Sequence, residues 1–358
     1  MRETPAIEAT GLTKSYGRNT VVDGIDLAVA RGAVFALLGP NGAGKTTTVR
    51  ILATLTAADA GRASVAGHDI VTERSRVRHA ISLTGQFAAV DEKQTGEENL
   101  RMMARLRRLP RREAHRRAHE LLDRFDLTAA ARRLVGTYSG GMRRRLDLAA
   151  GLVGDPEVLF LDEPTTGLDP RSRAELWQVV RELSGDGATV FLTTQYLEEA
   201  DRLADRIALV DGGRLVAEGT ADELKTRVAG HRLDLVATDT PAYWRITSRL
   251  DGVPRLSPGP GTGAGPETGP GAGAETGTGT GRVSEPGTAS GQRTTTRRTH
   301  HSPETLTIGL PTNGTATEVR ALLDAMDPDR SDIARFSVHQ TTLDDVFLTL
   351  TGKEPAHV

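Results

Sequence analysis

A glycine-rich stretch, GPNGAGKTT at residues 39–47, follows the apolar run AVFALLG and precedes a segment with helical character. Glycines placed in this way before a Lys-Thr pair are typical of a phosphate-binding loop, in which backbone N–H groups at a helix N-terminus surround phosphate oxygens. We expect Lys45 to contact the β- and γ-phosphates of a nucleotide and the hydroxyl of Thr46 to ligate Mg²⁺. The alternative is a glycine-rich turn without a ligand. The loop residues expected to bind the nucleotide are Gly39, Pro40, Asn41, Gly42, Ala43, Gly44, Lys45, Thr46 and Thr47.

Length and charge limit the possible classes of protein. With 358 residues the chain has room for two domains, because single cores tend to divide beyond roughly 250–300 residues. Lys and Arg number 45 and Asp and Glu 47, so the net charge of −2 gives no reason to expect nucleic acid as a partner. There is no cysteine, which excludes disulfides and a cysteine nucleophile. No secretion signal and no apolar run of about 18 residues occurs, so we expect a soluble chain whose membrane role needs a partner.

The pattern of the chain predicts two domains. Over 1–230, short β-like runs alternate with helical segments, which favours an α/β layout that contains a nearly all-helical block at about 95–153. Thr95 and Glu98 have the spacing of a capping box at the start of that block. A small α+β domain is expected over 231–358. It is interrupted at about 254–303 by a stretch rich in Gly, Pro and Thr, too poor in apolar residues to fold.

Two carboxylates follow the apolar run VLFL at residues 158–161. Ligands of open α/β sheets bind beyond the C-terminal ends of the strands, which is where Asp162 and Glu163 would lie. We expect Asp162 to hold Mg²⁺ through its hydration shell and Glu163 to orient and deprotonate an attacking water. An ordinary acidic strand end is the alternative.

The segment YSGGMRRRLDLAAGL at 138–152 places Ser139, Gly140 and Gly141 just before a predicted helix. A hydroxyl and unhindered N–H groups at a helix N-terminus form a second possible phosphate site, although an SGG triplet alone is usually only a flexible cap. Taken with the phosphate-binding loop, the carboxylate pair and the GLDP sequence that follows, this segment resembles the signature of ABC-type ATP-binding cassettes. The resemblance covers residues 6–220 and follows the order of motifs in that family.

The resemblance implies a P-loop NTPase fold, with a mixed sheet core, an antiparallel β part and a helical subdomain. It also implies that two cassettes pack head to tail, so that a homodimer or a related second cassette completes each ATP site. Tyr16 would stack on adenine, unless it is simply a surface tyrosine in a turn, and Asp169 would brace the opposite subunit. Gln86 would approach the metal and the water while its loop touches a membrane partner; by itself it is more often an ordinary loop amide.

Three residues depart from the usual family pattern. Tyr138 and Met142 flank the SGG centre, where the family commonly has Leu and Gln. Gln195 stands where most of the family has a histidine, at the end of the predicted strand in FLTTQYLEEA. A glutamine can bridge the γ-phosphate and the catalytic water but cannot become cationic, so we expect it to position groups while Glu163 acts as the base. A helix-capping glutamine without nucleotide contact is the alternative.

The Gln195 segment, the SGG helix and the final TLDDVFLTLTG look like the ATP-binding subunits of daunorubicin/doxorubicin-resistance type exporters. This resemblance implies a separate membrane permease, attachment to the cytoplasmic face of the cell membrane, and efflux of hydrophobic drugs or secondary metabolites. Asp345 replaces a Glu of the family's C-terminal box. An apolar stripe there is expected to dock on its own domain rather than on a partner; its residues are Leu343, Val346, Phe347 and Leu350.

Three further possibilities concern the partners and the activity of the chain. Seven arginines in the helical block could suggest nucleic acid or anionic lipid, but acidic residues lie among them and a solvated helix face is expected. These arginines are Arg105, Arg107, Arg108, Arg111, Arg112, Arg116 and Arg117. A soluble ABC-type ATPase that acts on the ribosome or DNA is the alternative function. A nucleotide-binding regulator without turnover is opposed by Glu163.

Overall fold

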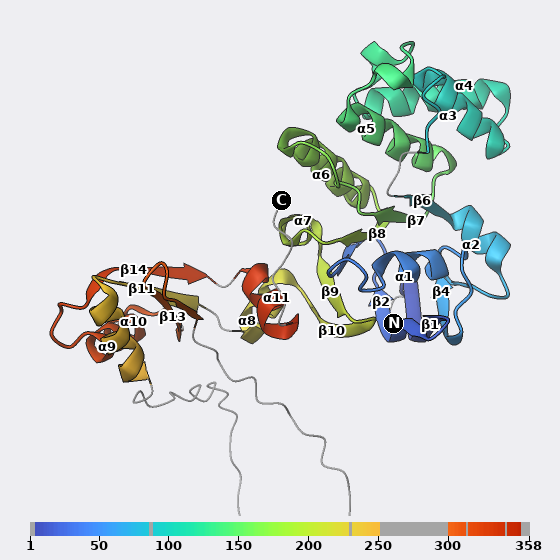
Figure 1. Ribbon diagram of the computed structural model, residues 1–358. Coiled ribbons are helices and arrows are strands. Elements are labelled where there is room, and N and C mark those ends of the chain that lie inside the picture. Colours follow the sequence, from blue (N-terminus) through green and yellow to red (C-terminus); the bar gives the residue numbers. More distant parts are fainter. Residues whose placement is uncertain are drawn as a thin grey trace, which may run out of the picture. The chain divides into compact units, whose positions relative to one another are not determined.

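The computed structural model describes residues 4–85, 89–228, 231–250, 300–312, 314–340 and 342–351. The chain divides into two compact units, Met1–Val228 with Thr341–Val358, and Ala229–Gln340 (Figure 1). The Gly/Pro/Thr-rich stretch predicted at about 254–303 lies almost wholly outside the described residues, and so does Gln86.

The first unit contains two sheets. Its strands are β1 (Ile7–Tyr16), β2 (Asn19–Val29), β3 (Val34–Leu38), β4 (Ala60–Val65), β5 (His68–Asp69), β6 (Ile81–Thr84), β7 (Val158–Asp162), β8 (Thr189–Thr194), β9 (Arg206–Asp211) and β10 (Arg214–Gly219). One sheet is antiparallel, in the order β2-β1-β4-β5. The other has the order β10-β9-β3-β8-β7-β6, and only β10 runs antiparallel to its neighbour. This mixed core confirms the predicted fold class.

Every residue of β3, β7 and β8 is buried, which explains why these strands do not alternate apolar and polar residues. One core cluster packs on the face of the central sheet toward β1, β2, β4 and α1, and a second cluster packs on the opposite face against α5, α6 and α7. The helices of this unit are α1 (Lys45–Leu52), α2 (Arg74–Ala80), α3 (Gly96–Leu106), α4 (Arg111–Arg124), α5 (Gly140–Gly151), α6 (Pro170–Gly185), α7 (Leu197–Leu203), α8 (Ala221–Val228) and α11 (Leu343–Thr351), with short 3-10 turns at Thr128–Ala130, Val135–Thr137 and Leu152–Gly154.

The predicted helical block consists of α3, α4 and α5, which lie together in Figure 1. The capping box is confirmed: Oγ1 of Thr95 accepts from the N–H of Glu98, whose carboxylate accepts from the N–H of Thr95 at 2.8 Å. Tyr138, one of the departures from the family pattern, is buried and donates its hydroxyl hydrogen bond to O of Ala130 at 2.7 Å. A Cβ on Gly96 would collide with that hydroxyl, so the absence of a side chain at Gly96 makes room for Tyr138.

Two of the seven arginines in the block are not simply solvated. Arg107 donates to the backbone oxygens of Arg78 and Ile81, at 3.3 and 3.1 Å, and Arg117 donates to O of Leu152 at 2.9 Å. The other five are exposed, as predicted. The expectation of a solvated face was therefore wrong for Arg107 and Arg117, because each long side chain reaches carbonyl oxygens beyond its own helix.

The second unit is a small α+β domain. Its antiparallel sheet has the order β12-β13-β11-β14, and its helices share a core with that sheet. The elements are β11 (His231–Ala237), α9 (Thr240–Leu250), β12 (His300–Ser302), β13 (Thr307–Thr312), α10 (Ala316–Met326) and β14 (Ile333–Gln340).

The C-terminal helix α11 belongs to the first unit. The sequence had predicted that all of 231–358 forms the second domain. Leu343, Val346 and Phe347 are buried in a core cluster of the first unit, and Leu350 packs against it. The helix contacts α7, α8 and β10. The apolar stripe itself was foreseen, but an amphipathic helix does not specify which apolar surface it covers.

Candidate active site

The predicted phosphate-binding loop connects β3 to α1, in the strand-loop-helix order that the motif requires. Gly44 is the N-cap of α1 with φ of 98°, a conformation that residues with side chains rarely adopt, and a Cβ there would collide with O of Val21. The first turn of α1 contains no acidic residue, and Gly44 supplies no side-chain cap. The partial positive charge of this helix end is thus suited to an anion.

Lys45 is the first residue of α1 and is almost fully buried. Its Nζ donates to the backbone oxygens of Gly39 and Pro40, at 2.8 and 3.1 Å, and lies 3.4 Å from Oε1 of Glu163. Burial lowers the pKa of Lys45 below its usual range, while the charges of Glu163 and Asp162 oppose that shift. The ammonium group is therefore a cation held out of water by carbonyl oxygens and a carboxylate.

Asp162 ends the buried strand β7 and meets the phosphate-binding loop. Oγ1 of Thr46 donates to Oδ1 of Asp162 at 3.1 Å, and Oγ1 of Thr193 on β8 donates to the same oxygen at 2.6 Å. The structure thus brings together two of the three side chains predicted to serve a metal ion; the third, Gln86, lies outside the described residues.

Glu163 follows at the end of β7 with φ of 48°, which is unusual for a residue other than glycine. Its N–H donates to O of Thr193 at 3.1 Å, which ties the left-handed residue to β8. Such backbone conformations persist only where the surroundings stabilise them, and they are common at active sites. Here the turn brings the carboxylate to Nζ of Lys45.

An open cleft of about 440 Å³ lies over the loop and contains Glu163 and Gln195 among its walls. Gln195 comes just before Tyr196, the N-cap of α7, and that cap makes no side-chain hydrogen bond. Gln195 is thus not the N-cap residue and lines the cleft, while its contact with a nucleotide stays a prediction. The lining residues are Val21, Asn41, Gly42, Ala43, Gly44, Lys45, Thr46, Thr47, Glu163, Thr166 and Gln195.

The SGG segment begins α5, away from the lining of this cleft. Ser139 is the N-cap of α5, and its Oγ accepts from the N–H of Met142 at 3.2 Å. Ser139 and Gly140 are exposed, whereas Gly141 is buried against α6, where a Cβ would collide with Oγ of Ser172. Ser139 and Gly140 thus lie at an exposed helix N-terminus, as predicted, and its binding of an anion stays a prediction.

Asp169 is the N-cap of α6. Its carboxylate accepts from the N–H of Ser172 at 2.9 Å and from the hydroxyl of Ser172 at 2.7 Å. These hydrogen bonds lower the pKa of Asp169. Because Ser172 is also the residue that crowds Gly141, the GLDP and SGG segments are adjacent within one chain.

Tyr16 ends β1 and is 51% exposed. Nζ of Lys14 lies 5.6 Å from the ring centroid. The ring is not part of the cleft lining. Stacking of Tyr16 on a nucleotide base therefore stays a prediction.

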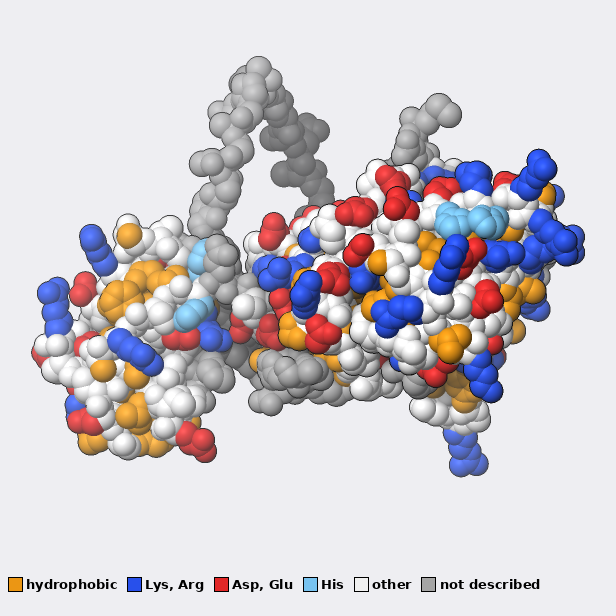
Figure 2. All heavy atoms as spheres, turned by 90° about the horizontal axis from the view of Figure 1, so that it is seen from above, with side chains coloured by type: hydrophobic (Ala, Val, Ile, Leu, Met, Phe, Trp, Pro, Cys, Tyr) orange, Lys and Arg blue, Asp and Glu red, His pale blue; other side chains and the backbone are white. Residues whose placement is uncertain are grey.

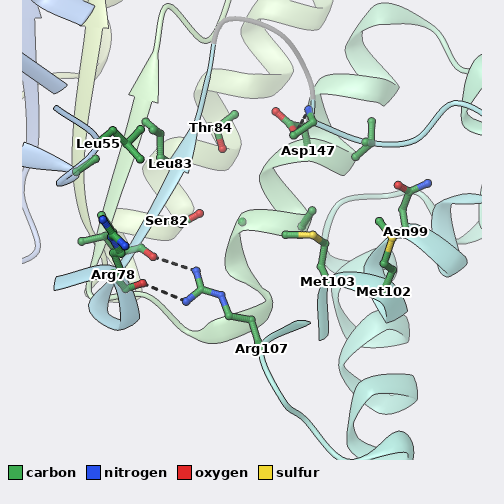
Figure 3. A pocket seen from close by; sticks show the side chains of 16 residues that line it. Leu55, Arg78, Ser82, Leu83, Thr84, Asn99, Met102, Met103, Arg107 and Asp147 are labelled. Atoms are coloured by element: carbon green, nitrogen blue, oxygen red, sulfur yellow. Dashed lines mark hydrogen bonds between the residues drawn. The ribbon is translucent and has the colours of Figure 1, made fainter. Parts of the chain in front are cut away.

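A second cavity, of about 240 Å³, opens between α3 and the strand β6, next to the ends of the chain segment that contains Gln86 (Figure 3). Met102 and Met103 approach it from α3, while Leu55 and Leu83 line the side of the strands. Arg107 closes one end through its two bonds to backbone oxygens, and Asp147 lies at the other end.

A buried ion pair in the SGG helix was not predicted from the sequence. Nη1 of Arg144 lies 3.4 Å from Oδ2 of Asp147 and donates to O of Gly85 at 2.7 Å, and its Nε donates to O of Pro164 at 2.8 Å. Oδ1 of Asp147 accepts from the N–H of Ala89 at 2.8 Å. Burial lowers the pKa of Arg144 and raises that of Asp147. The acidic Asp147 within an otherwise apolar run could have indicated this pair.

The burial of Glu199 on α7 was also not predicted, because the adjacent Glu198 is an identical residue that is exposed. It is fully buried and accepts a hydrogen bond from Nε1 of Trp177 at 3.2 Å. Burial raises the pKa of Glu199, while the hydrogen bond from Trp177 opposes the rise. No local pattern distinguishes the two glutamates; the difference arises from α6, which covers only one of them.

Residues 22–166 match the family model described as "ABC transporter". The chain is 62% identical over 231 residues to the daunorubicin resistance ATP-binding protein DrrA3 of Streptomyces coeruleorubidus, a match that covers 64% of this chain and 73% of that protein. It is 43% identical over 248 residues to the Nod factor export ATP-binding protein I of Ralstonia nicotianae, covering 69% of this chain and 77% of the relative.

Among solved structures, an ATP-binding subunit of an ABC transporter is 29% identical, with a TM-score of 0.56, and covers 62% of this chain and 92% of that one. The cbiO1 protein of Clostridium perfringens is 25% identical with a TM-score of 0.59, and covers 63% of this chain and 92% of that one. The sequence motifs, the fold and these relatives all indicate an ABC-type ATP-binding cassette. The chain therefore belongs to the ABC transporter family and is one of its ATP-binding proteins of the daunorubicin/doxorubicin resistance type.

Proposed function

We propose that this chain binds and hydrolyses ATP and thereby energises the efflux of hydrophobic drugs or secondary metabolites through a separate membrane permease. The observation that carries the proposal is the cleft in which the buried Lys45 meets Glu163 beside Gln195. The drug-resistance and export names of the relatives support the transport part. They do not favour the alternative of a soluble ATPase that acts on the ribosome or DNA.

In this mechanism the phosphates of ATP lie against the loop 39–47 and the first turn of α1. Nζ of Lys45 has three donors, which now point to two carbonyl oxygens and to Glu163. A γ-phosphate would replace Glu163 as a partner of Lys45. The carboxylate could then turn to a water molecule.

Thr46 and Asp162 fit a magnesium ion, because both offer hard oxygen donors and already approach each other to 3.1 Å. When bound there, Mg²⁺ would neutralise phosphate charge. Glu163 would accept the proton of the attacking water, and the amide of Gln195 would orient that water toward the γ-phosphate. The family-based approach of Gln86 to this site remains part of the proposal.

A second cassette would complete the site. Ser139, Gly140 and the backbone of Gly141 offer an anion site on an exposed helix end that does not line the cleft of its own chain. In a head-to-tail homodimer, or with a related cassette, this helix end would meet the γ-phosphate of the partner, and Asp169 would brace the contact. Tyr16 would stack on the adenine.

The permease would dock at the cavity between α3 and β6. Arg144 and Asp147 hold Gly85 and Ala89, which flank Gln86 at the edge of this cavity, so a docked segment would be coupled to the ends of that loop. The structure contains no helix that could cross a bilayer among its described residues. The export and resistance names of the relatives support the proposal that the chain attaches to the cytoplasmic face of the cell membrane through the permease.

The test uses a tagged Glu163→Gln chain, which should bind ATP without turning it over. We would purify it with ATP from detergent-solubilised native membranes and identify the accompanying proteins. The parent chain and Glu182→Gln, at an exposed carboxylate on α6, serve as controls. Enrichment of a polytopic membrane protein supports the proposal. Recovery of only ribosomal or other soluble proteins would contradict the proposed transport function. The proposed ATPase activity would still stand.

A further inference from the structure

Three side chains that can bind metal ions converge on the surface of the helical block. Glu97 lies in the first turn of α3, and His115 and His119 lie on α4. Oε1 of Glu97 is 3.6 Å from Nε2 of His115 and 3.8 Å from Nε2 of His119. Across the part of the chain that the structure describes, no other three His, Asp or Glu side chains converge in this way.

The arrangement follows from helix geometry. Residues four apart lie on the same face of a helix, so His115 and His119 project together, and their ring centroids are 4.5 Å apart. The two imidazoles are about half exposed, at 54% and 49%, whereas the carboxylate of Glu97 is only 14% exposed. Figure 2 shows adjacent histidine side chains on the surface of the first unit, close to basic side chains. An ion could thus reach the group from solvent.

We propose that Glu97, His115 and His119 form a binding site for a borderline divalent transition-metal ion such as Zn²⁺. Two imidazole nitrogens and one carboxylate oxygen are a common zinc donor set, and a water molecule would take the fourth position. Ligand atoms about 2.0–2.1 Å from a tetrahedral zinc ion lie about 3.3 Å from one another. The two carboxylate–imidazole distances of 3.6 and 3.8 Å are close to that value, and all three ligand atoms lie within 4.8 Å of one another, so side-chain rotations could bring them onto one ion.

One neighbouring cation competes for the carboxylate. Nη1 of Arg101 lies 3.5 Å from the same oxygen of Glu97, but its side chain is 51% exposed and can turn toward water. Hard ions such as Mg²⁺ and Ca²⁺ prefer oxygen ligands, so they should not compete at a site with two imidazoles. This preference separates the proposed site from the Thr46 and Asp162 pair in the nucleotide cleft.

A bound ion would join the start of α3 to α4. These helices contact each other, and both belong to the block that carries the SGG helix α5. Zn²⁺ should therefore protect the amides of α3 and α4 from hydrogen exchange, because it adds a link between the two helices.

The test is a calorimetric titration of Zn²⁺ into the full nucleotide-free chain, prepared without a polyhistidine tag, with Mg²⁺ as the comparison ion. We expect one saturable equivalent of Zn²⁺ and slower exchange in α3 and α4. His115→Ala and His119→Ala should each weaken binding by about tenfold or more, since even the loss of an outer-shell partner typically costs 10–100-fold. Glu97→Gln should weaken it as well.

The matched control is His79→Ala on α2, an exposed histidine outside the group, which should bind Zn²⁺ like the parent. Circular dichroism would verify that each variant is folded. The proposal is overturned if the parent shows no saturable equivalent, or if the His115→Ala/His119→Ala double variant binds Zn²⁺ as tightly as the parent. In either outcome the histidine pair is only a surface hydrogen-bonding group.

Discussion

Lys45 and Glu163 form an ion pair inside the cleft, with 3.4 Å between Nζ and Oε1 and only 4% and 11% of the two side chains exposed. The pair joins the phosphate-binding loop to the turn after β7. When ATP binds, its γ-phosphate should compete with Glu163 for the ammonium group of Lys45. We therefore expect ATP binding to separate the pair.

Replacement of Glu163 by Gln should abolish turnover while it preserves nucleotide binding. The amide keeps the shape of the side chain but cannot accept the proton of water, and loss of a general base typically costs about 10²–10⁴-fold. Steady-state phosphate release and binding of a fluorescent ATP analogue would measure the two properties. Hydrolysis within twofold of the parent rate would show that another group is the base.

Gln195→Ala should lower kcat by about 10–100-fold with little change in KM, because positioning of the water matters mainly in the transition state. Gln195→His should recover part of the rate through its ring nitrogens. Gln178→Ala, an exposed amide on α6, is the matched control. An unchanged kcat for Gln195→Ala would remove Gln195 from the mechanism.

Arg144→Met should lower the free energy of unfolding by about 3–5 kcal/mol, because it leaves Asp147 buried without its cation. The double variant Arg144→Met/Asp147→Leu should recover much of that loss. Urea unfolding provides the measurement. Arg143→Met is the control, since its partner Glu92 forms a surface pair worth about 0–1 kcal/mol. Equal losses in Arg144→Met and Arg143→Met would contradict the inference.

Glu199 should make the first unit less stable at higher pH. Burial raises its pKa in the folded state, so the folded chain keeps a proton that the unfolded chain loses above about pH 4.3. The free energy of unfolding then falls as pH rises from there to the folded pKa.

Glu199→Gln should lack this pH-dependent loss of stability, because an amide does not titrate. The free energy of unfolding of Glu199→Gln minus that of the parent should therefore increase between pH 5 and 8 in urea titrations. Glu198→Gln changes an exposed neighbour on the same helix and should show no such rise. A difference between Glu199→Gln and the parent that stays constant with pH would mean that Glu199 titrates normally.

Phe347→Ala should destabilise the first unit by about 3–5 kcal/mol, the usual cost of truncating a buried aromatic side chain. Leu348→Ala, at the adjacent and 39% exposed position, should change stability by no more than about 0.5 kcal/mol. Equal effects would mean that α11 does not pack on the cassette core. Unfolding monitored by the fluorescence of Trp177, which lies in that same core cluster, would report the change.

Features encoded in short, continuous stretches could be predicted from the sequence. The loop that ends at Thr47, the carboxylates after β7 and the Thr95 capping box depend on neighbours within a few residues, and each has the predicted local form. The sequence also placed the phosphate-binding loop and Glu163 at one nucleotide site, and the strands that they follow, β3 and β7, both pair with β8. The contact between Lys45 and Glu163 itself was not predicted.

Features that depend on distant partners could not be predicted in the same way. The stripe of α11 predicts a buried face but not the surface of α7 and α8 that it meets. Arg144 stands in a run of three arginines, and only the approach of Gly85 and Pro164 makes it a buried residue. Glu199 differs from Glu198 only through the packing of Trp177.

The position of α11 has a consequence for how the protein is made. The cassette core lacks Leu343, Val346 and Phe347 until the ribosome has synthesised the whole second unit and the glycine-rich stretch within it. A nascent chain that stalls in that stretch leaves an apolar surface on α7 and α8 uncovered, and such surfaces promote aggregation and capture by chaperones. Completion of the first unit therefore has to wait for synthesis of the second unit, and chains that stop before α11 should be cleared rather than assembled.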